Sequence, residues 1–277
     1  MEQTPHEIMT RHQALADHQG PYSPRFVLAP PPADAVPIDR GMEQALSVWL
    51  DEEIERTPGA DRKLAAAYTM GRISWSLALP LAGLALSGAW LIEAREGSAS
   101  ASVRLVTWQH EGESGVAPVF DAALSPRGAR FSALPDAAGA DRFRQAYEIL
   151  LAPLVDSLHA ASGLPRAALW RLAGDSLSAG FLEAGTEAGD PERAMTLVLP
   201  MLREKGSPLY ARQTGFVRAR LPERPDVCGW FRARGGCCRY YTAEGGEYCT
   251  TCVLRDPKSR KDRLIDHLRR THPELAA

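Results

Sequence analysis

The sequence predicts an α+β protein, mostly helical, with a small antiparallel sheet and a cysteine-rich C-terminal segment. Three observations support this class. Apolar residues recur at three- and four-residue steps through much of residues 42–202, which is typical of amphipathic helices. Residues 101–134 instead alternate apolar and polar side chains between Gly, Ser and Pro, which is typical of short strands. Four of the five cysteines fall within residues 237–252.

Composition divides the chain of 277 residues into three parts. Residues 1–40 are rich in proline and polar residues, and we expect a loose leader with little helix. Residues 41–221 are expected to form the helical α+β domain, and residues 222–277 a cysteine-bearing segment with a basic helix. With 45% hydrophobic and 24% charged residues, the composition is that of a globular protein able to bury a full core.

The first helices follow from apolar spacing and capping residues. One helix is expected from Met42 to about Arg56, and Asp61 is expected to cap the next helix. That helix leads into residues 73–92, which are 20 consecutive uncharged residues with a tryptophan near each end. We interpret them as a buried pair of helices kinked at Pro80. Their length also permits a membrane span, and contact with a membrane surface stays open.

The remaining elements are placed in the same way. Residues 101–134 predict an antiparallel meander, and residues 141–162 predict a strongly amphipathic helix. Pro165 opens another helix, and the pair Asp190-Pro191 signals a third that runs through Leu202. Residues 215–221 are expected to form a strand that leads to the cysteines.

The spacing of the cysteines indicates a metal site. Cys237 and Cys238 are adjacent, and Cys249 and Cys252 follow as a Cys-x-x-Cys pair. Thiolates select zinc, copper(I) or iron–sulfur centres. Neighbouring side chains diverge, so two consecutive thiolates fit poorly on one zinc tetrahedron, whereas a two-iron cluster offers two metal atoms that each need two thiolates. These four cysteines are therefore predicted to bind a [2Fe–2S] cluster.

The first residues bear on the compartment. Residues 1–6 have neither a basic start nor an apolar run, so we expect no secretory signal and a chain kept where thiols stay reduced. We accordingly expect a cytoplasmic location, with peripheral association at the inner face of the cell membrane left open.

The cysteine spacing resembles the FhuF-like family of ferric siderophore reductases, whose hallmark is C-C-x10-C-x2-C binding a [2Fe–2S] cluster. All four ligand positions are matched, and the tyrosines and glycines between the cysteine pairs also look like the family. Residues 164–170 resemble, more weakly, the family's Leu-Trp helix. The resemblance implies an enzyme that reduces an Fe(III)–siderophore, of hydroxamate type, and releases Fe(II) in iron acquisition.

An electron donor must come from outside the chain. A [2Fe–2S] centre moves one electron at a time, and the sequence shows no Gly-rich nucleotide loop, so we expect a separate ferredoxin or flavin reductase as donor. From Arg203 onward the chain holds 16 Lys and Arg against nine Asp and Glu, a formal charge of +7. The preceding residues carry −9, so the basic end is expected to attract an acidic donor or an anionic iron complex. Nucleic acid is not expected.

Side chains beside the cysteines are candidates for tuning the cluster and contacting its partners. Arginines are expected to hold an anionic chelate or a donor protein. Cys228, the fifth cysteine, is interpreted either as a buried thiol or as a fifth ligand. The candidate neighbours are Arg232, Arg234, Arg239, Tyr240, Tyr241, Thr250 and Thr251.

Two other functions remain open from the sequence. One is a non-catalytic zinc module in which Cys249, Cys252, His267 and His272 organise a binding surface, although their spacing departs from that of a zinc finger. The plainer interpretation of this end is an amphipathic helix that buries its leucines and exposes its histidines. The other function is an electron carrier or redox sensor that keeps the cluster without a siderophore pocket.

Overall fold

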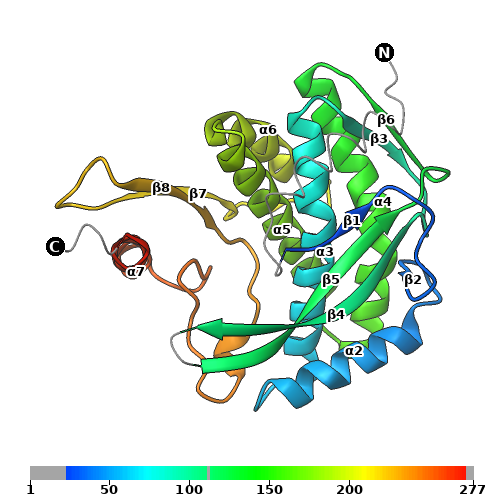
Figure 1. Cartoon of the computed structure of the whole chain (residues 1–277), viewed down its shortest axis with the longest axis horizontal. Helices are drawn as coiled ribbons and strands as arrows, with labels where there is room; N and C mark the ends of the chain where they lie inside the picture. Colours follow the sequence, from blue (N-terminus) through cyan, green and yellow to red (C-terminus); the bar gives the residue numbers. More distant parts are fainter. Residues whose placement is uncertain (1–22, 111–112, 273–277) are drawn as a thin grey trace.

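The computed structural model describes residues 23–110 and 113–272. Its body is a packed group of helices with a sheet along one side (Figure 1). The helices of this body are α2 (Glu43–Arg56), α3 (Arg62–Leu86), α4 (Asp136–Ser162), α5 (Arg166–Glu187) and α6 (Pro191–Arg203). The α+β class, mostly helical with small sheets, is confirmed.

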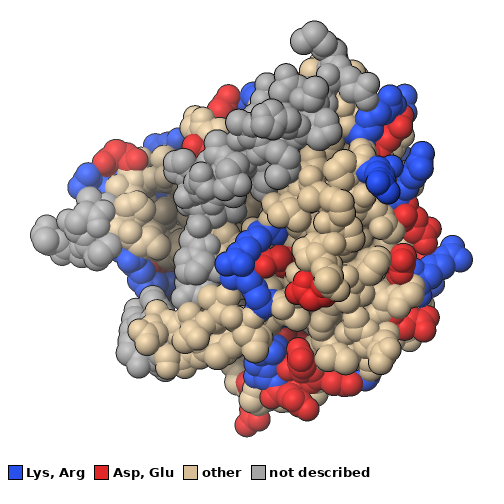
Figure 2. Space-filling view, turned by 45° about the vertical axis from the view of Figure 1, so that its right-hand side comes forward, with Lys and Arg blue, Asp and Glu red and all other residues tan. Residues whose placement is uncertain are grey.

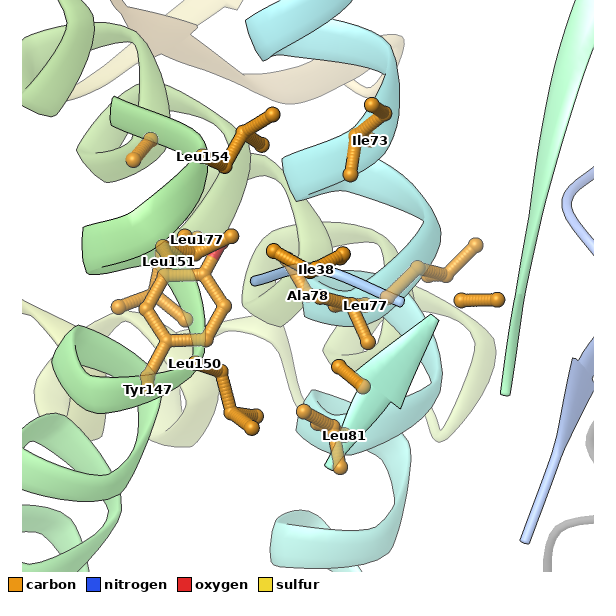
Figure 3. Close-up of a cluster of buried hydrophobic side chains, with 14 of the residues drawn as sticks. Ile38, Ile73, Leu77, Ala78, Leu81, Tyr147, Leu150, Leu151, Leu154 and Leu177 are labelled. Atoms are coloured by element: carbon orange, nitrogen blue, oxygen red, sulfur yellow. The ribbon is translucent and has the colours of Figure 1, made fainter. Parts of the chain in front are cut away.

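The main core lies where α3, α4 and α5 face one another. Figure 3 shows Leu77 and Leu81 of α3 opposite Tyr147 and Leu150 of α4. All four side chains are buried, and the Tyr147 hydroxyl donates a hydrogen bond of 3.1 Å to the carbonyl oxygen of Ser74. Burial of these apolar faces removes them from water and fixes α3 against α4 and α5.

The uncharged stretch forms one helix and a strand. The expectation of a kinked helix pair was wrong, because α3 runs through Pro80 without a break and ends at Leu86. A proline inside a helix removes a single hydrogen bond, and here the buried apolar residues on both sides keep the helix packed. Gly88, with φ of 93°, then turns the chain into β3 (Trp90–Ala94). None of the helices in the described residues is long and apolar enough to cross a membrane.

The larger sheet is built on a long hairpin. Strands β4 (Ala99–His110) and β5 (Glu113–Leu124) pair antiparallel along their full length. Strand β1 (Phe26–Val27) pairs parallel with β5, and β2 (Val36–Pro37) pairs antiparallel with β4. The described part of the expected leader is therefore held in the sheet, since its short apolar stretches complete both edges. The remainder of that leader, residues 1–22, lies outside the described residues.

Several predicted elements are confirmed. The meander continues into β6 (Ala129–Ser132), although this strand pairs with β3 in a separate two-stranded sheet. The Asp61 side chain caps α3 by accepting 2.7 Å from the Leu64 N–H, and Asp190 caps α6 by accepting 3.0 Å from the Arg193 N–H. Both caps satisfy backbone donors that a helix start leaves unpaired.

A second, smaller unit carries the C-terminal end. Strands β7 (Gly215–Arg220) and β8 (Cys228–Ala233) form a hairpin that projects from the helical body, with α7 (Pro257–Thr271) beside it (Figure 1). The hairpin spans the domain boundary expected between residues 221 and 222. A separate apolar cluster holds it to the helix, made of Ala219, Leu221, Leu264, Ile265 and Leu268.

Charge is unevenly spread over the body. On the face drawn in Figure 2, acidic side chains gather at the lower edge, where α2 lies in Figure 1. The sequence of α2 explains this, because it contains five acidic residues against one basic residue.

Candidate metal centre

The four clustered cysteines lie on one loop, residues 234–254, which we call the cysteine loop. It begins where β8 ends and finishes shortly before Asp256, whose side chain caps α7. Directly after Cys238, Arg239 adopts φ of 64° and is the non-glycine residue with positive φ among those described. This left-handed conformation costs a non-glycine residue free energy and marks a locally strained turn. The turn leads into a short 3₁₀ helix, η1 (Tyr240–Thr242).

The fold brings the four sulfurs together in interacting pairs. Cys238 and Cys249 share a side-chain hydrogen bond, and Cys237 interacts electrostatically with Cys252 and with Cys238. The hydrogen bond from Cys249, together with the charge of Arg234, lowers the pKa of Cys238 to about 5. The same bond raises the pKa of Cys249. Burial raises the pKa of Cys237. The site therefore favours a thiolate, the ligand form of cysteine, at Cys238.

Each of the four sulfurs accepts an N–H hydrogen bond. The backbone N–H of Arg239 lies 3.4 Å from Cys237 Sγ, and the backbone N–H of Leu254 lies 3.4 Å from Cys252 Sγ.

Cys238 and Cys249 complete this set of sulfur acceptors. Cys238 accepts from the backbone N–H of Tyr240 and from the Arg234 side chain. The Arg234 guanidinium also reaches Cys249 Sγ at 3.8 Å. Donors to sulfur stabilise thiolates and tune a bound iron–sulfur centre.

The four thiols form one interacting group on this loop. Cys238 interacts with Cys249, Cys237 interacts with Cys252 and Cys238, and Cys249 also interacts with Cys252. Four thiolates, two for each iron atom, are the ligand set of a [2Fe–2S] cluster. A buried N–H at Arg239 Nε, unpaired in the described part, is a further donor on this loop.

A residue that the sequence did not single out anchors the loop. Asp175 of α5 is only 1% exposed, and its carboxylate accepts hydrogen bonds from the backbone N–H groups of Gly235 at 2.7 Å and Gly236 at 3.0 Å. It also accepts 3.2 Å from Arg234 Nε. No local sequence signal could have found this contact, because Asp175 precedes the loop by about 60 residues.

The far side of the loop rests on the turn between α2 and α3. The backbone N–H of Glu244 donates 2.9 Å to the carbonyl oxygen of Pro58. A Cβ on Gly59 would lie 2.6 Å from that nitrogen, so the approach requires glycine. Arg239 Nη2 forms an ion pair of 3.0 Å with Asp61. The loop is therefore held between α5 and the start of α3.

The predicted neighbours of the cysteines take different positions. Arg234 contacts sulfur, and Arg232 Nη1 donates 2.6 Å to the carbonyl oxygen of Asp175. Tyr240 and Tyr241 are exposed, and the ring centroids of Tyr241 and Tyr248 are 5.1 Å apart. Thr250 and Thr251 are half-buried, and the carbonyl oxygen of Thr251 accepts a hydrogen bond from the Arg234 backbone N–H.

A pocket of about 400 Å³ adjoins the loop. Two of its lining residues, Arg232 and Arg234, interact electrostatically with Cys238 and Cys249. Burial lowers the pKa of Arg232, whose side chain forms no ion pair among the described residues. The lining comes from α3, α5, β8 and the loop, and comprises Gly71, Arg72, Trp75, Leu172, Asp175, Ser176, Ala179, Glu183, Arg232 and Arg234.

The residues of the alternative zinc site do not come together. The His267 ring lies edge-on to Phe231 with centroids 5.7 Å apart, and His272 Nδ1 lies 3.1 Å from the carbonyl oxygen of Leu268. Both histidines thus contact the hairpin or their own helix. Cys228 stands apart from the other cysteines at the start of β8, where Arg218 Nη2 donates 3.3 Å to its sulfur.

Comparison with known families agrees with this geometry. Residues 234–254 match the family described as the FhuF 2Fe-2S C-terminal domain, and this range contains all four clustered cysteines. The match bears out the resemblance seen in the cysteine spacing and indicates a [2Fe–2S] cluster as the cofactor. No curated protein matches the chain.

Proposed function

Starting from a chain whose cysteine loop is a FhuF-type 2Fe–2S domain, we propose that it is a ferric siderophore reductase. Cys237, Cys238, Cys249 and Cys252 are the proposed cluster ligands. The observation that carries the proposal is the position of this loop, whose sulfurs lie beside a pocket that shares two arginines with them. Substrate and cluster can therefore approach each other without a long gap between them.

For the proposed reduction, the protein has to place the ferric chelate close to the cluster. When bound, the [2Fe–2S] cluster supplies one electron at a time. Hard oxygen ligands of a siderophore hold Fe(III) tightly, and reduction to Fe(II) lowers the charge of the substrate iron and weakens these bonds. The iron can then pass to another ligand. No acid or base residue is needed, so the residues of the pocket act by binding and orientation.

The pocket offers two kinds of contact to a chelate. Trp75 and Leu172 provide an apolar side, and Arg72 and Arg232 provide guanidinium donors for chelate oxygens. Arg72 is held by an ion pair with the buried Glu53, and one nitrogen of Arg232 donates to the carbonyl oxygen of Asp175. The remaining N–H groups of the two guanidiniums are the proposed donors to chelate oxygens. A volume of about 400 Å³ lies within the usual range for ligand sites.

The electron donor and the location belong to the same proposal. The formal charge of +7 from Arg203 onward supports an acidic donor protein, such as a ferredoxin, that docks near the cysteine loop. The free thiols support a reducing compartment, for which we propose the cytoplasm.

Single-turnover reduction under anaerobic conditions tests the activity. Dithionite-reduced protein, freed of excess reductant, is mixed with a ferric trihydroxamate and a ferrous trap. We expect the oxidised absorption of the cluster to return as about one Fe(II) per cluster is trapped, because one electron leaves each centre. A reduced protein that stays reduced with the chelate, yet passes electrons to a dye, would be a carrier and would contradict the proposal.

Filling the pocket tests where the chelate binds. Ala179→Phe places a ring in the pocket beside the cysteine loop, and we expect KM for the chelate to rise about tenfold or more with unchanged iron content, since bulk excludes substrate. The matched control is Ala137→Phe, which fills a second pocket of about 480 Å³ between α4 and α6. Equal KM values for the two variants would show that the chelate does not bind in the pocket beside the cysteine loop.

A further inference from the structure

Asp175 is a buried carboxylate, and burial of a carboxylate costs free energy. A carboxylate taken out of water costs several kcal/mol unless charges or hydrogen bonds compensate it. Its compensation comes from the neighbourhood of the cysteine loop: two backbone N–H groups, Arg234 Nε, and the Thr214 hydroxyl at 3.4 Å. Because three of these four donors belong to residues 234–236, Asp175 is satisfied only when the loop is docked on α5.

The glycines next to Asp175 show how close this docking is. A Cβ on Gly235 would lie 2.1 Å from Thr214 Oγ1, and a Cβ on Gly236 would lie 3.0 Å from the backbone nitrogen of Leu172. Gly235 therefore packs against Thr214 where a Cβ would clash, and Gly236 lies so close to α5 that a Cβ would force its neighbour to shift. The residues just before Cys237 and Cys238 are thus tightly docked.

Arg234 links this anchor to the sulfurs. One side of its guanidinium is paired with Asp175, while Nη1 lies 3.8 Å from Cys249 Sγ and the side chain also donates to Cys238. The arginine is largely buried, so its charge is poorly screened by solvent. Burial alone would lower the pKa of Arg234, but the charges of Asp175 and of the two cysteines outweigh it and raise that pKa.

We propose that Asp175 and Arg234 are a positioning pair that sets the reduction potential of the cluster. Reduction adds one negative charge to an iron–sulfur centre. A cation held against its thiolates stabilises the reduced form and raises the potential. Asp175 touches no sulfur, and it acts by holding Arg234 and the loop in place. The proposal rests on the cysteine ligand set and is independent of the ferric substrate.

The test is a potential measurement on loaded protein. Native protein and the variants Arg234→Gln, Arg234→Lys and Asp175→Asn are titrated with dithionite, with reduction followed by electron paramagnetic resonance. Iron and sulfide are quantified in each sample. Arg269→Gln is the matched control, because Arg269 lies on α7, pairs with the exposed Glu223 outside the cysteine loop, and loses the same charge.

Arg234→Gln is expected to lower the midpoint potential. Arg234→Lys is expected to lower it less, since lysine keeps the positive charge but lacks the planar guanidinium that bonds to Asp175 and to the cysteine sulfurs at the same time. Arg269→Gln is expected to leave the potential within experimental error of native. A native potential in either loaded Arg234 variant, or an equal shift in the control, would overturn the proposal. So would a folded chain that loads no cluster in both Arg234 variants, because Arg234 would then be structural.

The double variant tests the coupling between the two residues. The shift in potential caused by Asp175→Asn is expected to differ between the native and the Arg234→Gln backgrounds, since Asp175 acts through the arginine. Identical shifts in both backgrounds would overturn the pairing. If the potentials shift as expected but the protein does not reduce a ferric chelate, the proposed function alone is contradicted. If variants of the four cysteines keep their cluster, the proposed ligand set is contradicted.

Discussion

The adjacent thiols Cys237 and Cys238 are the most informative residues of the chain. The fold brings this pair beside the second pair of cysteines, since Cys238 bonds to Cys249 and Cys237 interacts electrostatically with Cys252 and with Cys238. Arg239, with its positive φ, turns the backbone so that two successive N–H groups bond to these sulfurs. The strained conformation of Arg239 thus helps to hold in place the two sulfurs that we propose as ligands.

Serine substitution tests the ligand set one residue at a time. We expect Cys237→Ser, Cys238→Ser, Cys249→Ser and Cys252→Ser each to lower iron and sulfide content severely, because a hydroxyl is a poor ligand for this cluster. Cys228→Ser is the control, since Cys228 bonds to Arg218 away from the loop. Normal cluster content in two of the four variants would exclude this set.

At this scale, sequence reasoning singled out the four cysteines that share one loop and missed the residue that anchors it. The cysteines are close along the chain, so residue type and spacing were enough to group them. Asp175 meets Gly236 across 61 positions, and an aspartate inside a helix has no local feature that marks it as buried. Its role depends on how α5 packs against the loop, which spacing alone does not reveal.

At the scale of elements, caps and apolar spacing predicted the helices well. Asp61 and Asp190 cap α3 and α6 as expected, and α2, α4, α5 and α7 lie where the patterns placed them. Strands β1 and β2 were missed because each has only two residues, too few for an alternation to show. The helix through Pro80 was misjudged because tertiary burial outweighed the local cost of proline.

Asp61 caps α3 and also pairs with Arg239 of the cysteine loop, and its contribution to stability depends on pH. Burial alone would raise its pKa, but the Leu64 N–H and the charge of Arg239 outweigh it and lower the pKa of Asp61. Its stabilising effect is therefore complete above the ordinary value of 3.8 and is lost as pH falls through the lower folded-state value.

We expect Asp61→Ala to cost about 1 kcal/mol of unfolding free energy at neutral pH through loss of the cap. Asp61→Asn, which keeps a capping side chain, is expected to cost less than half as much. Denaturant unfolding at pH 7 and at pH 3 measures both variants. An equal loss in the two variants at pH 7 would show that the cap contributes nothing of its own.

At the scale of the whole molecule, two units have different surfaces. The helical body carries an acidic α2, and the unit of β7, β8 and α7 carries much of the positive charge. The cysteine loop joins them and is anchored to the body by Asp175 and Pro58. A donor that docks on the basic unit would therefore reach the loop from the side of α7.

The basic unit predicts a salt-dependent electron donor. We expect the rate of reduction by an acidic ferredoxin to fall several-fold between about 0.05 and 0.5 M salt, because screening shortens the reach of surface charge. Lys258→Glu with Lys261→Glu, two exposed changes on α7, are expected to slow the reaction further at low salt. Glu52→Gln on α2 serves as the control. Stopped-flow rates that change neither with salt nor with the α7 substitutions would argue against donor docking on this unit.

The most direct test of the whole account is the metal content of the native protein. Chain purified without oxygen is assayed for iron, acid-labile sulfide and zinc, and its dithionite-reduced form is examined by electron paramagnetic resonance. The account predicts about two iron atoms and two sulfides per chain, with a signal on reduction typical of a [2Fe–2S] centre. Colourless protein that carries zinc or no metal, and no sulfide, would contradict it.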